Sequence, residues 1–120
     1  DYIKIPSGEI TNLPFLIRIA QMNRSIILST GMAEMEEIKR ATEILFKHGV
    51  DRSKIIILHC NTEYPTPMRD VNLKAMNFIG DKLNVQIGYS DHTLGIDAAV
   101  FRAFSNCCLA DSTIRVLSLK

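Results

Sequence analysis

The sequence predicts an α/β protein built on a parallel sheet, because short β-rich runs alternate with helical segments along the chain. The apolar run at 54–59 is almost unbroken, which is typical of a strand covered on both faces of such a sheet. The 120 residues, of which 47% are hydrophobic and 22% charged, can build one globular domain. That length falls far short of the roughly 250 residues of a closed (β/α)₈ barrel.

Four β-rich runs define the expected strands, and turn residues follow the first two and the last of them. The runs are residues 2–5, 25–28, 54–59 and 85–87. Asn12 can cap the helix after the first run, and the early Pro14 is tolerated in its first turn. Because strand–helix–strand units cross over right-handed, the carboxyl ends of all four strands should share one edge of the sheet.

The helix between the second and third runs is indicated by its charges. Glutamates crowd its first turn, and Lys47 and His48 close its last turn, which complements the helix dipole at both ends. Gly49 then serves as a C-cap. A shorter helix is expected around residues 72–78, with Gly80 as its stop.

Charge and cysteine content narrow the class of protein. The formal net charge of +1 indicates neither a nucleic-acid partner nor an acidic membrane surface. No apolar run approaches the roughly 18 residues of a membrane span, and the start of the chain lacks a signal-peptide layout, so a cytoplasmic protein is expected. The three cysteines, with no C-x-x-C spacing, fit reduced thiols better than disulfides.

Chemistry-bearing side chains follow the strands, most clearly in Gly88-Tyr-Ser-Asp-His-Thr-Leu-Gly95, which places a hydroxyl, a carboxylate and an imidazole after the last run. Imidazole and carboxylate ligands suit Zn, Mn or Fe. His92 lies beyond the strand, where a packing role is less expected, whereas His59 within a strand is more often a core residue. We expect convergence at one edge of Ser7, Ser29, His59, Tyr64, Ser90 and His92.

Each of the other features has a plainer interpretation beside the functional one. Ser29-Thr-Gly31 before a helix can bind an anion or simply cap the helix. Lys4 either projects into a polar barrel lumen or marks an edge strand. Glu9 can transfer protons or belong to a surface turn, and Tyr64 can stack on a ligand or plug its loop. Nothing in the flanking sequence activates Cys60 as a nucleophile.

Four strand-end motifs, in this order and spacing, resemble the sialic acid synthase family, which includes the N-acetylneuraminate, legionaminic and pseudaminic acid synthases. They are Lys4-Ile-Pro-Ser-Gly-Glu9, Leu28-Ser-Thr-Gly-Met32, Leu58-His-Cys-Asn-Thr-Glu-Tyr-Pro-Thr-Pro67 and Gly88-Tyr-Ser-Asp-His-Thr93. The resemblance implies a (β/α)₈ TIM barrel followed by an antifreeze-like domain. Residues 1–100 would supply about strands 4 to 7 of that barrel, and residues 101–120 form a divergent tail.

The resemblance also implies an activity. Family members condense phosphoenolpyruvate with an N-acetylated sugar, such as N-acetylmannosamine or a related bacillosamine-type sugar, to a nonulosonic acid and release phosphate. They use a divalent metal, Mn²⁺ or Mg²⁺, and the parent enzyme is expected to be a homodimer. The Thr-Glu-Tyr version of the tyrosine loop looks closer to the legionaminic acid branch.

Roles are carried over from the motifs residue by residue. The resemblance implies a catalytic Glu9, a metal ligand at His92, and substrate contacts from Lys4, Ser7, Ser29, Asn61, Thr62, Tyr64 and Ser90. Lys4, Ser7, Ser29 and Ser90 would face phosphoenolpyruvate, and Tyr64 would face the sugar.

Two departures from the family pattern qualify these expectations. Many relatives carry asparagine two residues before the tyrosine, where this chain has Thr62. The sequence at 101–120 lacks the eighth-strand motif with the second metal histidine. We therefore expect a truncated or frameshifted fragment that is inactive alone.

Two other functions stay open at this point. One is a different phosphate-handling barrel aldolase in which Lys4 forms a Schiff base. The other is a non-catalytic remnant that pairs its open sheet edges with another chain.

Overall fold

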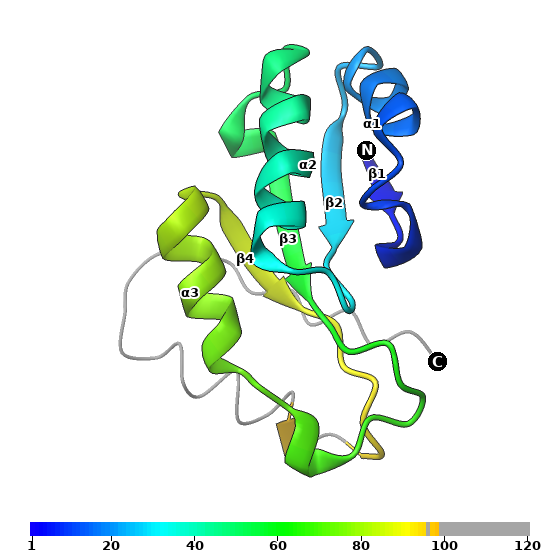
Figure 1. Ribbon diagram of the computed structural model, residues 1–120, viewed down its shortest axis with the longest axis vertical. Coiled ribbons are helices and arrows are strands. Elements are labelled where there is room, and N and C mark those ends of the chain that lie inside the picture. The colour runs from blue at the N-terminus through cyan, green and yellow to red at the C-terminus, as the bar shows by residue number, and fades with distance from the viewer. Residues whose placement is uncertain (96, 99–120) are drawn as a thin grey trace.

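A computed structural model describes residues 1–95 and 97–98, and within them a four-stranded parallel sheet carries three α-helices on one face (Figure 1). The strands are β1 (Tyr2–Ile5), β2 (Ser25–Ser29), β3 (Ile55–His59) and β4 (Gln86–Tyr89). The helices are α1 (Leu13–Ala20), α2 (Met35–Lys47) and α3 (Lys74–Leu83), with short 3₁₀ turns η1 (Ser7–Glu9), η2 (Arg52–Lys54) and η3 (Met68–Asp70). The predicted alternation of strands and helices is confirmed.

The strands pair in chain order, β1-β2-β3-β4, and every pairing is parallel. One row of the register runs from Lys4 through Ile27 and Ile56 to Gln86. Each strand is therefore a neighbour of the next one along the chain, and all four carboxyl ends lie at one edge of the sheet.

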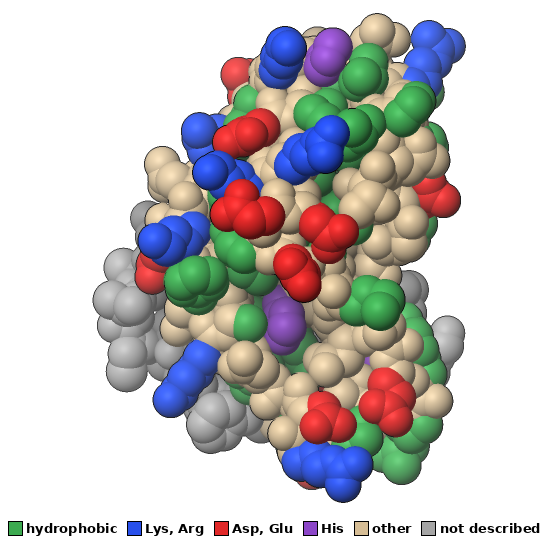
Figure 2. Space-filling view, viewed as in Figure 1, with side chains coloured by type: hydrophobic (Ala, Val, Ile, Leu, Met, Phe, Trp, Pro, Cys, Tyr) green, Lys and Arg blue, Asp and Glu red, His purple; other side chains and the backbone are tan. Residues whose placement is uncertain are grey.

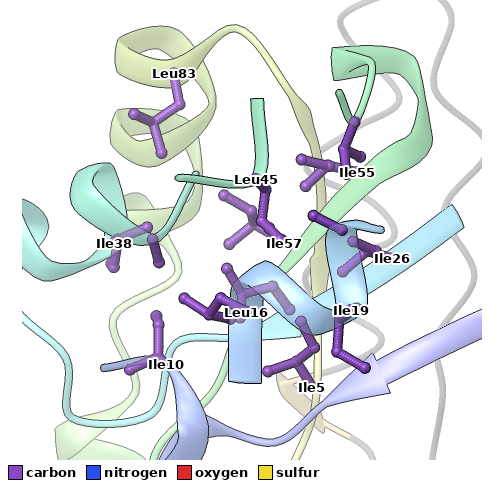
Figure 3. Packing of buried hydrophobic residues seen from close by; sticks show 14 of the residues in the cluster. Ile5, Ile10, Leu16, Ile19, Ile26, Ile38, Leu45, Ile55, Ile57 and Leu83 are labelled. Atoms are coloured by element: carbon purple, nitrogen blue, oxygen red, sulfur yellow. The ribbon is translucent and has the colours of Figure 1, made fainter. Parts of the chain in front are cut away.

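The hydrophobic core lies between the sheet and the helices (Figure 3). Alternate strand residues face this core, and among them Ile5, Ile26 and Ile57 are completely buried. Leu16 of α1 and Leu45 of α2 are equally inaccessible and pack into the same cluster. The period-two alternation thus assigns one face of each strand to the helices, and Ile56, on the opposite parity, is only partly buried.

The ends of the first two helices follow the predicted chemistry. The Asn12 side chain accepts a hydrogen bond from the Phe15 backbone N–H at 3.3 Å, which caps α1. Gly49 follows the end of α2 with a φ of +96°, the left-handed conformation that glycine adopts without steric cost.

The prediction that Gly80 stops the third helix is wrong. α3 continues to Leu83 and ends at Asn84, which takes the left-handed conformation with a φ of +50°. A Cβ on Gly80 would lie 2.9 Å from Ile87 Cγ1, so this glycine permits the close approach of α3 to β4. A glycine occupies position 80 because of this tertiary packing and not because the helix ends there.

Two predictions concern the carboxyl-terminal part of the chain. The domain boundary between residues 100 and 101 and the divergent tail lie outside the described residues, as do Cys107 and Cys108. Cys60 is buried and is a free thiol.

Replacing Ile57 by alanine should remove about 2 to 5 kcal/mol from the free energy of unfolding, because the residue is fully buried and its loss leaves a cavity. Ile56→Ala is the matched control on the adjacent, partly exposed position and should cost less. Urea denaturation followed by circular dichroism measures both. Equal losses in the two variants would contradict the assignment of the two sheet faces.

Candidate functional site

The candidate site is assembled from the segments that follow the four strands. η1 follows β1, the loop 30–34 follows β2, the loop 60–67 follows β3, and residues 90–95 follow β4. Two backbone bonds continue the sheet into this region: Thr30 N–H donates to the Leu58 carbonyl at 3.0 Å, and Ser90 N–H donates to the His59 carbonyl at 2.9 Å. The site therefore rests on the rigid end of the sheet.

Gly31 is the point at which three of these segments meet. A Cβ added there would lie 2.5 Å from Ser7 Cβ and 3.0 Å from Thr62 Cγ2, and the glycine has a φ of +54°. Its N–H donates to the Cys60 sulfur at 3.3 Å. Only a glycine meets both the steric and the conformational demand, so Gly31 lets the ends of β1, β2 and β3 come into contact.

His92 is the centre of the second half of the site. Its Nε2 lies 3.2 Å from Ser90 Oγ and 3.1 Å from the Tyr64 hydroxyl, and the Tyr64 ring stacks on the imidazole with centroids 4.1 Å apart. Its Nδ1 lies 2.6 Å from the Asn61 carbonyl oxygen. Because a carbonyl can only accept, Nδ1 carries the proton and donates it. Nε2 then presents a lone pair toward the two hydroxyls.

Three predicted site residues are therefore brought together around the imidazole, namely Tyr64, Ser90 and His92. Asn61 joins them through its main-chain carbonyl, whereas its side-chain amide donates to the carbonyl of Asp70 in η3 at 3.1 Å. Ser7 and Thr62 form a second group beside Gly31. No sequence pattern pointed to the Asn61 carbonyl, because a main-chain acceptor leaves no trace in residue type.

Lys4 and Ser29 lie on β1 and at the end of β2. Lys4 is exposed and alternates with Ile3 and Ile5, which pack against the core, so it belongs to the sheet face away from the helices. β1 is an edge of the described sheet, so both interpretations of Lys4 stay open. Ser29 is buried, with 4% of its surface exposed.

Glu9 is tied to the start of α1. Its carboxylate accepts a hydrogen bond of 2.6 Å from the Asn12 side-chain amide, and Asn12 in turn caps α1. A catalytic role for Glu9 stays a prediction.

The anion site suggested for Ser29-Thr-Gly31 is not supported by the start of α2. The Thr30 hydroxyl donates to the Leu58 carbonyl at 3.3 Å, and α2 begins only at Met35. The Glu34 backbone N–H donates to the Glu37 carboxylate at 2.9 Å, so a capping contact within the helix already uses this donor. Figure 2 shows acidic side chains gathered over this end of the helix, which disfavours an anion there.

Of the two interpretations of His59, the structure supports a packing role and not convergence of its side chain on the site. Its ring lies beside Tyr89, with centroids 6.0 Å apart, and Tyr89 packs against Met76 of α3. Burial lowers the pKa of His59, and a hydrogen bond with the Asn72 backbone opposes that shift in part. Strand alternation gives the reason, since His59 shares the parity of the helix-facing Ile57.

A divalent metal was expected at His92, and the imidazole fits part of that role. Histidine ligands of metals commonly donate one ring N–H to a carbonyl and use the lone pair of the other nitrogen; His92 Nδ1 makes such a bond, and its Nε2 lone pair now faces two hydroxyls. Within residues 1–95 and 97–98, however, no group of three or more His, Cys, Asp or Glu side chains is placed to hold a metal ion. The described residues thus offer one ligand and not a complete set.

The fold and this site define an α/β protein that gathers its candidate functional side chains at the carboxyl edge of a parallel sheet. Residues 1–107 match the NeuB family, and the chain belongs to that family.

Several relatives are named as legionaminic, pseudaminic or sialic acid synthases. The N,N'-diacetyllegionaminic acid synthase of Campylobacter jejuni is 51% identical over 108 residues, covering 90% of this chain and 32% of the relative. That of Legionella pneumophila is 40% identical, covering 91% and 31%. The crystal structure of N-acetylneuraminic acid synthetase from Leptospira borgpetersenii in complex with citrate aligns with a TM-score of 0.80 at 36% identity, covering 87% of this chain and 35% of that one. The chain spans about a third of the length of these relatives.

A search of the described helices for a membrane-spanning segment finds none of sufficient length and apolar character.

Gly31→Ala should destabilise the chain by more than Gly49→Ala. Both substitutions force a side chain into a positive φ, but only the first also drives a Cβ to 2.5 Å from Ser7, whereas nothing lies within 4 Å at Gly49. We expect an additional loss of about 1 to 3 kcal/mol, measured by urea denaturation. Equal losses would show that the ends of β1 and β2 are not in contact.

His59→Gln should flatten the acid dependence of stability. The folded-state pKa of His59 lies below its ordinary value of 6.5, so the unfolded chain binds the proton more readily. The wild-type free energy of unfolding should therefore fall as the pH drops below about 6.5, and part of that fall should vanish in the variant. Denaturation midpoints between pH 7.5 and 5 measure it, and parallel curves would contradict a partly buried histidine whose pKa is lowered.

Proposed function

We propose that this chain forms part of the substrate site of a nonulosonic acid synthase, which condenses phosphoenolpyruvate with an N-acetylated sugar and releases phosphate. Membership of the NeuB family and the names of the relatives support this reaction class. The four strands would correspond to about strands 4 to 7 of a (β/α)₈ barrel.

The observation that carries the proposal is the hydroxyl and imidazole cluster at the carboxyl edge of β4. Ser90 Oγ and the Tyr64 hydroxyl both face His92 Nε2, and all three belong to segments that the sheet holds together. Hydroxyl donors and a cation suit the several negative charges of phosphoenolpyruvate. We assign Ser7, Ser29 and Ser90, with Lys4 as the cation, to that substrate.

The reaction also requires groups around the sugar. C3 of phosphoenolpyruvate attacks the sugar aldehyde carbon to form a C–C bond, water adds at C2, and the C–O bond to phosphate breaks. We assign Tyr64, Asn61 and Thr62 to the sugar and Glu9 to proton transfer at the reacting centre. A divalent metal, Mn²⁺ or Mg²⁺, ligated in part by His92, would polarise the aldehyde when bound. The sugar is N-acetylmannosamine or a bacillosamine-type relative.

Binding of phosphoenolpyruvate is the direct test, because the chain spans about a third of its relatives and binding needs only part of the site. Titration followed by ³¹P NMR should show saturable binding. Ser90→Ala should weaken it about tenfold or more, since a hydrogen bond to a charged group contributes about 1.5 to 3 kcal/mol.

Ser53→Ala is the matched control, because Ser53 is exposed in η2, before the opposite end of β3. It should bind as the wild type does. Absence of binding by the wild-type chain, or equal affinity of Ser90→Ala, would overturn the proposal.

A second experiment tests the aldolase alternative. Treatment with borohydride and pyruvate should leave Lys4 unlabelled, and labelling of Lys4 would favour an aldolase instead.

A further inference from the structure

Thr66, in the loop after β3, contacts the backbone of His92 and of Thr93. The His92 carbonyl accepts a hydrogen bond of 2.8 Å from the Thr66 N–H, and Thr66 also forms an isolated parallel bridge with Thr93. Thr66 is buried, and its hydroxyl donates to the Glu63 carbonyl at 2.9 Å. The loop after β3 therefore supports the segment after β4.

The Asp91 side chain also restrains the backbone beside His92. One oxygen of its carboxylate, Oδ1, accepts a hydrogen bond of 2.9 Å from the Thr93 N–H. This bond spans His92 and closes a local turn in which a side chain replaces a backbone acceptor. The other oxygen, Oδ2, is buried and makes no hydrogen bond within the described residues. Burying a half-satisfied carboxylate costs free energy, so its presence calls for a compensating role.

Asp91 itself takes no part in the cluster around Nε2. Its charge acts instead toward Tyr89: burial first, and then the charges of Asp91 and Cys60, raise the pKa of Tyr89 to about 12. Ser90 and His92 contact each other, and Asp91 lies between them in the chain with its bonded oxygen directed at the backbone of Thr93. The hydrogen bond that the structure gives this carboxylate therefore acts on the backbone beside His92 and not on the imidazole itself.

We propose that Asp91 is a positioning residue, whose bond to the Thr93 N–H fixes the turn that aims His92 Nε2 between the hydroxyls of Ser90 and Tyr64. Without this bond, the Thr66 contact alone would hold the His92 carbonyl, and the imidazole could turn away from the Asn61 carbonyl. That the aim of Nε2 matters for substrate rests on the proposed function; the positioning itself does not.

The test compares wild type, Asp91→Ala and Asp91→Asn in the full chain by long-range ¹H–¹⁵N spectra of the histidine rings at one fixed pH. In wild type and Asp91→Asn, which keeps the acceptor oxygen, His92 should show the Nδ1–H tautomer. In Asp91→Ala the ring signals should move toward a mixture of tautomers, and the Tyr64 ring protons should shift as the stacking loosens.

Asp51→Ala is the matched control, since Asp51 is exposed at the start of η2 and its side chain makes no cap bond. It should leave the His92 signals unchanged. If Asp91 had only a general structural role, both Asp91→Ala and Asp91→Asn should change the His92 ring signals equally. Unchanged His92 signals in Asp91→Asn alone therefore distinguish positioning from a general structural role.

A measurement on the wild type covers the case in which Asp91→Ala does not fold. The Thr93 amide should exchange with solvent about tenfold more slowly than an unprotected amide, because it donates to Asp91. Any of three results would overturn the proposal: a Thr93 amide that exchanges without protection, unchanged His92 ring signals in Asp91→Ala, or shifted His92 ring signals in Asp91→Asn. Failure of phosphoenolpyruvate to bind, with these spectra as expected, would overturn only the proposed function.

Discussion

Parallel pairing of four consecutive strands is the constraint on which the site depends. Because each strand pairs with its neighbour in chain order, residues far apart in the sequence reach one edge of the sheet. The ladder extends beyond the strands through the bonds of Thr30 and Ser90 to the carbonyls of β3. The loops that carry the functional groups thus start from fixed positions, which limits the conformational entropy lost when a ligand binds.

The alternation of side chains along the strands places the residues that pack against the helices and the residues of the candidate site on opposite faces. On β3 the helix-facing positions hold Ile57 and then His59, while Cys60 lies on the other parity and contacts the Gly31 N–H. On β4 Tyr89 packs against α3, whereas Ser90 contacts His92. A single-residue shift in register would exchange the two sets, so the hydrophobic core fixes the orientation of the site.

Much of the fold could be predicted from the sequence because local chemistry and tertiary structure agree. β1 begins and ends where predicted, and Asn12 caps α1 as its residue type suggests. Gly80 was misjudged because its role depends on a contact with Ile87 of β4, whereas the packing role that is usual for a strand histidine is the one His59 takes, beside Tyr89, also of β4. The grouping of Tyr64, Ser90 and His92 followed from strand-end reasoning, but the Asn61 carbonyl is a backbone feature that residue types do not reveal.

The hydrogen bonds of His92 explain how one imidazole can be both rigid and available. Nδ1 is committed to the Asn61 carbonyl at 2.6 Å, a short bond to an acceptor that cannot rotate. Within the described residues, Nε2 faces two hydroxyls, which can turn their protons elsewhere without any movement of the backbone. A ligand at Nε2 therefore displaces two weak, adjustable contacts and leaves the orienting bond intact. Such a site is preorganised, because the free energy of ordering the imidazole is supplied by folding and not by binding.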